Sequence, residues 1–317
     1  MSDVPVRPRS DAWILAQRPP KNPVDPWRPY HFLTEEEPDA EGRLRRVAVI
    51  FLTNRECPFR CLMCDLWKNT LDAPVPTGAI PHQIAWALER LGSAALVKLY
   101  NSGNFFDSQA IPPGDYPHIA TRLTSFETVL VETHPKLVNQ RVLDFRRHLQ
   151  PRLEVAMGLE TVHPQVLPRL NKRMTLADFE RAVAFLLQHG IAVRAFVLLR
   201  PPFLSESEGV QWAKRSLDFA FEIGVECCTV IPTRAGNGAL EYLQRQGHFA
   251  PPTLASLEAV LEYGLRLGKG RVFADLWDAD RFATCRHCSS RRVQRIAQMN
   301  RTQQILPGVT CTICDEP

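Results

Sequence analysis

The sequence predicts an α/β protein built on a parallel β-sheet. From about residue 45 to residue 277, short runs of β-branched and other apolar residues alternate with longer segments of helical periodicity. This alternation is typical of β-α-β units, which join parallel strands through right-handed crossovers. A cysteine-rich motif follows the first strand directly, as expected of a functional loop on such a sheet. The expected strands are Val47–Leu52, Leu96–Tyr100, Thr128–Glu132, Leu153–Met157, Val193–Leu199 and Cys228–Ile231.

Helices are expected between these strands. In Thr175–His189, a threonine is placed to cap the amino end and Gly190 to end the helix. In Pro81–Leu91, apolar residues recur at helical spacing. Periodicity alone does not distinguish an open sheet from a barrel. The other expected helices are Leu137–Leu149, Ser205–Ile223 and Thr253–Gly268.

Composition divides the 317-residue chain into three expected parts. Residues 1–44 are rich in proline, which argues against a long helix or an inner strand. Four aromatic residues between Trp13 and Phe32 predict an arm packed on the core rather than a disordered tail. Residues 45–277 form the core domain. Residues 278–317 are expected to form a small metal-stapled module.

The overall composition is that of a soluble globular protein, with 45% hydrophobic and 23% charged residues. No apolar run approaches the roughly 20 residues that span a bilayer. The amino terminus lacks the apolar core of a signal peptide, so we expect a cytoplasmic protein with no membrane partner. The net charge of +4 permits an anionic partner without requiring one.

The most informative motif is the run ECPFRCLMCDLW, with Cys57, Cys61 and Cys64 in C-x3-C-x2-C spacing. Clustered cysteines in a reducing compartment indicate metal binding or catalysis rather than disulfides. Three thiolates can hold three irons of a cubane cluster and leave the fourth iron open to a small molecule. The alternative is a zinc knuckle that lacks its fourth ligand.

This motif resembles that of the radical SAM superfamily, whose members bind a 4Fe–4S cluster and S-adenosyl-L-methionine (SAM). The resemblance extends over about residues 45–265. It implies a partial (β/α)6 TIM-like barrel with its active site at the carboxyl ends of the strands. The segments NSGNFFD, ETHPK, GLETV, NKRMTLADFERA, LLRPPFLSESE and YLQRQGHFAPPTL resemble the branch of the Elongator catalytic subunit and the methylthiotransferases, and within it the radical SAM subunit of archaeosine synthase.

The resemblance also implies roles for residues near the cluster. Met63 stands where the family often has an aromatic residue beside the SAM adenine, and methionine is apolar and adaptable. Asn101, Ser102 and Gly103 begin the turn NSGN, in place of the usual Gly-Gly-Glu whose backbone binds the SAM amino group. The glycine allows close approach to a ligand. The alternative is a plain strand-to-helix turn.

Charged residues follow three later strands. Glu132 and Glu160 each place a carboxylate where ribose hydroxyls or an ammonium group can bind, and the match of GLET to the family favours Glu160. Arg200 follows the fifth strand and can meet the SAM carboxylate or an anionic substrate. Helix capping or a salt bridge is the competing role for either carboxylate. No catalytic residue is assigned.

Four further cysteines, Cys285, Cys288, Cys311 and Cys314, form two C-x2-C pairs separated by 22 residues. Two such pairs are a strong metal-binding pattern. Zinc is favoured, and a second iron–sulfur cluster is the alternative. Four arginines lie between the pairs, and they suit either a phosphate backbone or a solvated helix face. They are Arg291, Arg292, Arg295 and Arg301.

The expected function is that of a radical SAM lyase or transferase. Such an enzyme reductively cleaves SAM at its cluster and abstracts hydrogen from substrate. The resemblance implies a 7-deazaguanine-type nucleoside in RNA as substrate, with tRNA and a reductant such as flavodoxin or ferredoxin as partners. Two alternatives stay open. One is the same chemistry on a small molecule or peptide, and the other is a non-enzymatic metal-dependent nucleic-acid-binding protein.

Overall fold

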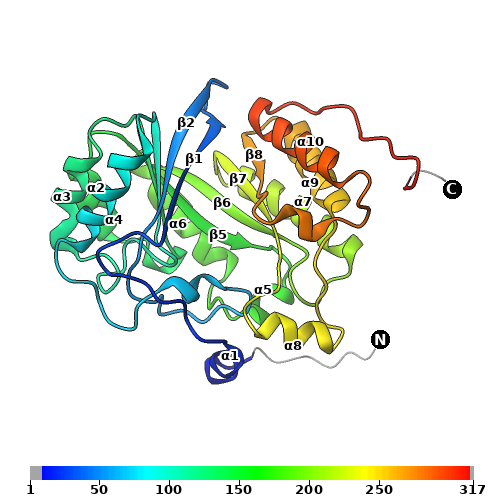
Figure 1. Cartoon of the computed structure of the whole chain (residues 1–317), viewed down its shortest axis with the longest axis horizontal. Helices are drawn as coiled ribbons and strands as arrows, with labels where there is room; N and C mark the ends of the chain where they lie inside the picture. Colours follow the sequence, from blue (N-terminus) through cyan, green and yellow to red (C-terminus); the bar gives the residue numbers. More distant parts are fainter. Residues whose placement is uncertain (1–8, 315–317) are drawn as a thin grey trace.

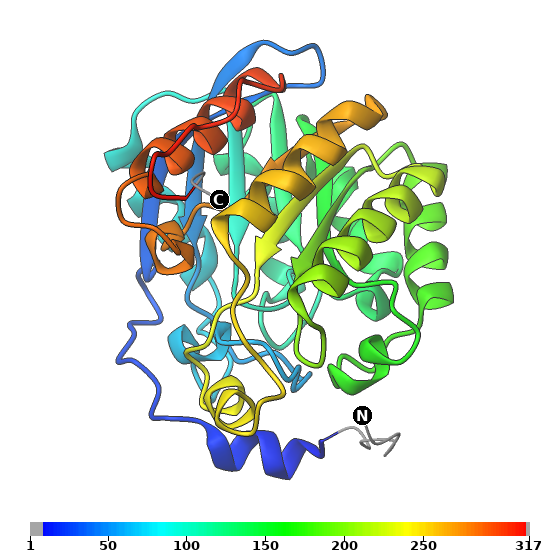
Figure 2. The same ribbon diagram turned by 90° about the vertical axis from the view of Figure 1, so that its right-hand side faces the viewer.

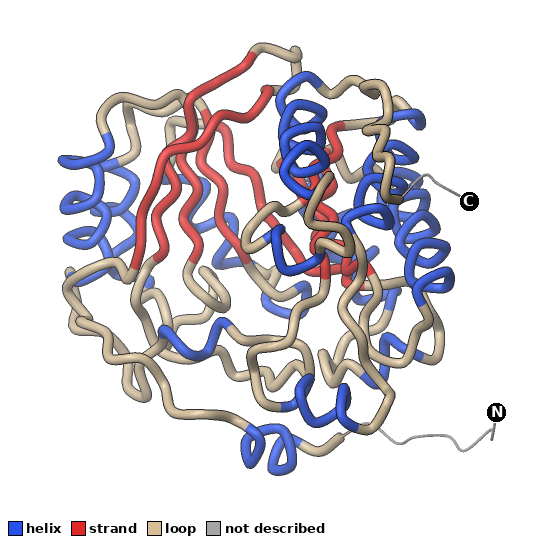
Figure 3. The backbone as a smooth tube through the Cα atoms, turned by 45° about the vertical axis from the view of Figure 1, so that its right-hand side comes forward, coloured by secondary structure: helices blue, strands red, loops and turns tan. Residues whose placement is uncertain are grey.

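An eight-stranded sheet, curled into a half-barrel, organises the molecule (Figures 1 and 3). The structure is a computed structural model and describes residues 9–314. The strands follow one another in sequence order, and all neighbours are parallel except the first pair. The predicted partial barrel is therefore confirmed. The strands are β1 (His31–Pro38), β2 (Leu44–Phe51), β3 (Leu96–Tyr100), β4 (Thr128–Glu132), β5 (Arg152–Glu160), β6 (Ala192–Leu199), β7 (Cys227–Pro232) and β8 (Arg271–Ala274).

The six predicted strands correspond to β2 through β7, and the structure adds one strand at each edge of the sheet. Strand β1 lies within the proline-rich segment and pairs with β2 in antiparallel register, with Phe32 opposite Ile50. An edge strand tolerates proline because one side of its backbone needs no partner, and Pro38 is its last residue. Strand β8 was missed because it has only four residues.

The predicted helices also form, with ends set by local caps. Thr175 and Asp178 cap α6 reciprocally, and Ser205 and Glu208 cap α7 in the same way. Helix α4 begins after Asn139, three residues later than predicted, because a 3-10 turn precedes it. The helices are α1 (Asp11–Gln17), α2 (Ala79–Leu91), α3 (Tyr116–Arg122), α4 (Gln140–His148), α5 (Val166–Arg169), α6 (Leu176–Gln188), α7 (Glu206–Glu222), α8 (Ala239–Arg245), α9 (Leu254–Leu267) and α10 (Ser289–Thr302).

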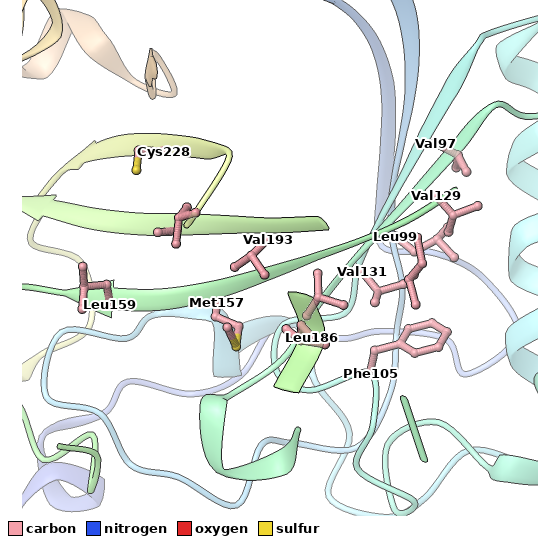
Figure 4. Close-up of a cluster of buried hydrophobic side chains, with 14 of the residues drawn as sticks. Val97, Leu99, Phe105, Val129, Val131, Met157, Leu159, Leu186, Val193 and Cys228 are labelled. Carbon is pink, nitrogen blue, oxygen red and sulfur yellow. The ribbon is translucent and has the colours of Figure 1, made fainter. Parts of the chain in front are cut away.

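The main hydrophobic core lies between the sheet and the helices on its outer face. Alternate residues of each strand point into this layer, as Val129 and Val131 of β4 do in Figure 4. Leu186 of α6 and Phe105 of the loop after β3 meet them there. None of the helices in residues 9–314 is long and apolar enough to cross a bilayer.

The inner face of the half-barrel carries a buried ionic network beside a small apolar cluster of Val47, Val49 and Leu96. Arg194 of β6 pairs with Glu37 of β1, and its Nε lies 2.7 Å from Oε1 of Glu154 on β5. Lys98 of β3 also pairs with Glu37, and Arg271 of β8 lies 3.4 Å from it. Burial alone raises the pKa of Glu37, but these cations outweigh it and hold that pKa well below its usual value.

This network joins the two edges of the sheet. Glu37 belongs to the first strand and Arg271 to the last, and these strands make no backbone ladder with each other. Helix α10 lies along both of them on the outside, as the red helix beside the blue strands in Figure 2 indicates. The half-barrel is thus closed by charges within and by a helix outside.

Replacing Arg194 with methionine tests the importance of this network. The change leaves the Glu37 and Glu154 carboxylates buried without their main cation, so we expect the free energy of unfolding to fall by about 3–5 kcal/mol in urea denaturation. The control is Arg147→Met, which removes an exposed pair with Asp144 and should cost at most about 1 kcal/mol. Equal losses in the two variants would contradict a special role for the interior charges.

Candidate active site

The cysteine triad lies in the loop that leaves β2 at the carboxyl end of the sheet. Cys57, Cys61 and Cys64 are all partly buried, and a 3-10 turn, Leu66–Asn69, follows them. In Figure 3 the loops gather at this end of the strands, together with α1 and α8. The triad therefore sits at the mouth of the half-barrel, where active sites of such folds lie.

Loops from the opposite side of the mouth hold the triad loop in place. The amide of Leu62 donates to the Leu170 carbonyl at 2.8 Å. Nδ2 of Asn171 donates to the Arg60 carbonyl at 2.8 Å, and Nδ2 of Asn237 donates to the Leu62 carbonyl at 2.8 Å. These contacts come from the segments after β5 and β7, so the loop spans the mouth and is fixed on both sides.

The three thiols have lost water without gaining a strong counter-charge. Burial raises the pKa of Cys61 to about 12 and also raises those of Cys57 and Cys64. The thiols therefore need a cation to become thiolates. One polar contact favours the charged form, since Nδ2 of Asn104 donates to Sγ of Cys57 at 3.0 Å.

The spacing of the sulfur atoms bears on which metal group fits the triad. Within residues 9–314, one group of three or more cysteine, histidine or acidic side chains has all its ligand atoms within 4.8 Å of each other. This group consists of the four C-terminal cysteines. The triad does not form such a group. Thiolates around one zinc ion lie close together, whereas cysteines of a cluster each bind a separate iron. The triad thus fits a cluster better than a zinc knuckle.

The predicted NSGN turn lies directly against the triad. A Cβ on Gly103 would sit 3.2 Å from Cβ of Cys57, so glycine permits this approach. Ser102 has a left-handed backbone with φ of 52°, and its hydroxyl lies 2.9 Å from that of Tyr30. Oδ1 of Asn101 is buried and has no hydrogen-bond partner. A buried acceptor without a partner is what a ligand ammonium group needs.

Glu132, at the end of β4, shapes this turn from beneath. Its Oε1 accepts hydrogen bonds from the amide of Asn101 at 2.7 Å and from that of Gly103 at 3.4 Å. Burial raises the pKa of Glu132 to about 7, and the amide hydrogen bonds only partly offset this effect. The carboxylate that the sequence analysis ranked second is therefore hydrogen-bonded to the predicted NSGN turn.

Glu160, at the end of β5, is held by a lysine that sequence reasoning did not single out. Nζ of Lys172 lies 2.5 Å from Oε1 of Glu160, and both side chains are buried. Glu160 has φ of 65° at a bulge in β5, and a side chain on Gly158 would occupy the space of its carboxylate. Burial alone lowers the pKa of Lys172, but Glu160 and Cys61 outweigh it and raise that pKa. The ammonium thus lies within electrostatic reach of the triad.

His134 is a second residue that the sequence did not assign. Its ring stacks on Phe59 of the triad loop at 3.7 Å, and its Nε2 lies 2.9 Å from the Lys172 carbonyl. The His134 amide donates to Oδ1 of Asn104 at 2.6 Å. Burial lowers the pKa of His134 to about 3, so the ring is neutral at pH 7. In the sequence, the signals were the quoted segments ETHPK and NKRM, which contain His134 and Lys172.

The two remaining predicted residues differ in their surroundings. Met63 lies between two small apolar clusters near the ends of β6 and β7, beside Phe203. Arg200 instead pairs with Glu206 at 2.5 Å and donates to the Pro251 carbonyl at 2.7 Å. These contacts support a structural role for Arg200 in the turn before α7, and its predicted contact with SAM stays a prediction without support here.

The C-terminal cysteines converge at a different place, outside the mouth. Sγ atoms of Cys285, Cys288, Cys311 and Cys314 all lie within 4.8 Å of each other, so they can hold a metal ion. Three of the four arginines considered for phosphate binding have carboxylate partners within the fold. Arg292 and Arg295 pair with Glu258, Arg295 also pairs with Glu262, and Arg301 pairs with Glu36.

The raised pKa of Glu132 predicts a pH dependence of stability. The usual pKa is 4.5, so between there and about pH 7 the folded protein holds a proton that the unfolded chain releases. We therefore compare the unfolding free energies of wild type and Glu132→Gln. The value for wild type minus that for the variant should fall as the pH rises from about 5 to 7.5, by up to about 1.4 kcal/mol per pH unit. Glu222→Gln, which alters an exposed carboxylate, is the control. A pH-independent difference would contradict the assignment.

Comparisons with known proteins bear on this site. No protein-family model matches the chain. The chain is 29% identical over 216 residues to the archaeosine synthase beta subunit of Thermococcus kodakarensis, covering 65% of the chain and 66% of that protein. It is 31% identical over 216 residues to that of Methanosarcina acetivorans, covering 63% and 60%. An uncharacterized protein of Methanocaldococcus jannaschii is 23% identical over 214 residues, covering 64% and 59%. The chain thus spans about three fifths to two thirds of these relatives.

Solved structures share the fold at low sequence identity. Elp3 of Methanocaldococcus infernus is 12% identical and has a TM-score of 0.52, over 68% of this chain and 58% of that one. SuiB of Streptococcus suis bound to SAM is also 12% identical, with a TM-score of 0.52 over 72% and 49%. Methylornithine synthase is 13% identical, with a TM-score of 0.50 over 71% and 64%. Together, the sequence and fold comparisons confirm the predicted resemblance: this chain is similar to the radical SAM superfamily, in its Elp3-like branch, and has the radical SAM fold.

Proposed function

We propose that this chain is a radical SAM enzyme that acts on a modified nucleoside of the 7-deazaguanine type in RNA. The observation that carries the proposal is a loop at the barrel mouth with three partly buried thiols whose sulfur atoms do not all lie within 4.8 Å of one another. In this proposal Cys57, Cys61 and Cys64 hold three irons of a 4Fe–4S cluster. When bound, that cluster supplies the electron that cleaves SAM to methionine and a hydrogen-abstracting 5′-deoxyadenosyl radical.

The surroundings of the triad suit a cationic, water-free group. The thiols are uncharged unless a cation binds them, because burial raises their pKa values. Asn104 donates to Cys57, and Lys172 adds positive charge near the cluster position. Hydrogen bonds and charges of this kind stabilise bound thiolates and tune a cluster. The loops that cross the mouth partly bury the triad, and exclusion of water from such a site protects reactive intermediates.

Residues beside the triad provide matching groups for SAM. The Asn101 Oδ1 acceptor and the Glu132 carboxylate suit its amino group, and the open backbone at Ser102 and Gly103 admits it. Glu160, oriented by Lys172, suits the ribose hydroxyls. Met63 supplies an apolar surface of the kind that an adenine ring packs against. No catalytic residue is assigned, because the difficult chemistry belongs to the cofactor.

The relatives support the proposed substrate class. Two of them are named archaeosine synthase subunit beta, so we infer a nucleoside in tRNA as substrate and a partner subunit for the reaction. A small iron–sulfur or flavin protein such as ferredoxin or flavodoxin would deliver the electron. The cytoplasm, where thiols stay reduced, is the compartment that suits this chemistry. The C-terminal cysteines form a second metal centre in this proposal, separate from the triad.

The alternatives are weaker on the same observations. A non-enzymatic nucleic-acid-binding protein would use the triad as a closed single-ion site, which the sulfur spacing does not favour. Its phosphate-binding arginines would also be free, whereas Arg292, Arg295 and Arg301 are paired with carboxylates. A small-molecule or peptide substrate is compatible with the site, and only the choice of substrate separates that alternative from the proposal.

The test is formation of 5′-deoxyadenosine by protein reconstituted without oxygen. With dithionite and SAM, we expect product from wild type and a loss of at least about a hundredfold with Cys61→Ala. The control is Cys228→Ala, which removes a buried thiol from the helix-facing side of β7 (Figure 4) and should keep the activity. Stimulation by tRNA from cells lacking the modification supports the RNA substrate, whereas no product with any of these proteins contradicts the proposal.

A further inference from the structure

The four C-terminal cysteines are arranged for one metal ion. Sγ of Cys285 lies 4.0 Å from that of Cys311, and Sγ of Cys288 lies 3.9 Å from that of Cys314. Nε of Arg292 adds a hydrogen bond to Sγ of Cys288 at 3.4 Å. Donors directed at sulfur stabilise the thiolate form that a metal requires.

The sulfur separations distinguish a single ion from a cluster. A tetrahedral site with metal–sulfur bonds of about 2.3 Å places its sulfurs about 3.8 Å apart. The observed separations of 4.0 and 3.9 Å are close to this value. An iron–sulfur cluster distributes its cysteines over several irons and needs a wider arrangement. Four thiolates in tetrahedral geometry around one ion are typical of structural zinc.

The helix that starts at this site covers the open edge of β8. Asn300 of α10 accepts from the amide of Ala274 at 2.9 Å and donates to the carbonyl of the same residue at 2.8 Å. Gln303, just after α10, does the same for Val272, with distances of 2.8 and 3.0 Å. The two side-chain amides thus take the place of a neighbouring strand, which satisfies an edge that would otherwise be unpaired.

The same helix reaches the other edge of the sheet. Arg301 lies 2.8 Å from Glu36 of β1, so α10 bridges the seam between the first and last strands. Arg292 and Arg295 pair with Glu258 of α9, which fixes the amino-terminal half of the helix. Cys288 is the residue immediately before α10, and the returning tail brings Cys311 and Cys314 to it. A metal at this point therefore clamps the start of the seam-covering helix.

We propose that Cys285, Cys288, Cys311 and Cys314 bind a single zinc ion, and that this ion holds α10 across the seam between β1 and β8. The zinc is a structural part of barrel closure and takes no part in electron transfer. Without it, α10 loses its anchor at Cys288, and we expect the amides of Val272 and Ala274 to open to solvent more often. The inference goes beyond the proposed function, which leaves the metal at these cysteines unidentified, and it concerns neither the triad nor SAM.

The first experiment determines the metal. The triple variant Cys57→Ala, Cys61→Ala, Cys64→Ala removes the triad, so any metal that remains reports on the second site. We expect one zinc per chain by mass spectrometry, and a tetrahedral thiolate spectrum after exchange with Co2+. The same chain with Cys311→Ser and Cys314→Ser added should contain none. Iron with acid-labile sulfide, a single iron, or Cys285–Cys311 and Cys288–Cys314 disulfides without metal would each overturn the zinc assignment.

The second experiment tests the link between zinc and the seam by hydrogen exchange. In the Cys311→Ser, Cys314→Ser variant we expect the Val272 and Ala274 amides to exchange at least about tenfold faster than in wild type, while β4 amides stay unchanged. Asn300→Ala with Gln303→Ala should expose the same amides and keep the zinc. If the serine variant does not fold, removal of zinc from wild type by a chelator gives the same readout. Unchanged exchange in zinc-free protein would overturn the structural role.

Discussion

The half-barrel depends most on the ion pairs that the buried carboxylate of Glu37 makes. Eight strands in sequence order leave two edges, and β1 and β8 make no backbone ladder with each other. Glu37 on the first strand meets Arg194 and Lys98 inside the sheet and Arg271 on the last strand. A buried charge is tolerated only when opposite charges surround it, so these residues must stay together whenever the fold is formed. The network therefore fixes the curvature of the sheet from within.

This arrangement also determines where chemistry can take place. Charged side chains and the apolar cluster of Val47, Val49 and Leu96 occupy the inner face, which leaves the carboxyl ends of the strands for a ligand. There burial raises the pKa values of Cys57, Cys61, Cys64 and Glu132, so these groups need nearby positive charge to ionise fully at neutral pH. A cationic cluster and an ammonium-bearing cofactor would supply that charge. The charges inside the half-barrel are thus paired with each other, whereas the groups at its mouth are suited to positively charged ligands, as the proposed function requires.

The sequence predicted the parts of the fold that local patterns encode. Strands β2 to β7 are apolar runs, and Thr175 caps the amino end of its helix as expected. Strand β1 was not predicted, because a run of acidic residues and Pro38 looks like a loop until its glutamates are paired with cations from distant strands. The arginines of helix α10 were expected to meet either a phosphate backbone or solvent, because their carboxylate partners Glu258 and Glu36 lie far away in the sequence.

In the candidate site, too, local features could be predicted from the sequence and contacts between distant segments could not. The cysteine spacing and the glycine of the NSGN turn are local features, and the turn does lie against the triad. Lys172 and His134 could not be assigned from spacing, since each matters through a contact with a different strand end or loop. Arg200 illustrates the converse, because a position at a strand end did not reveal that Glu206 and Pro251 already engage its guanidinium.

The central claim is that the triad holds a cluster with one iron that no protein side chain binds. Mössbauer spectroscopy of protein reconstituted with isotopically enriched iron tests it directly, with the C-terminal cysteines occupied by zinc. We predict a 4Fe–4S spectrum in which one iron site alone changes when SAM is added, and no such spectrum for Cys61→Ala. A spectrum unchanged by SAM, or a triad that retains only zinc, would contradict the claim.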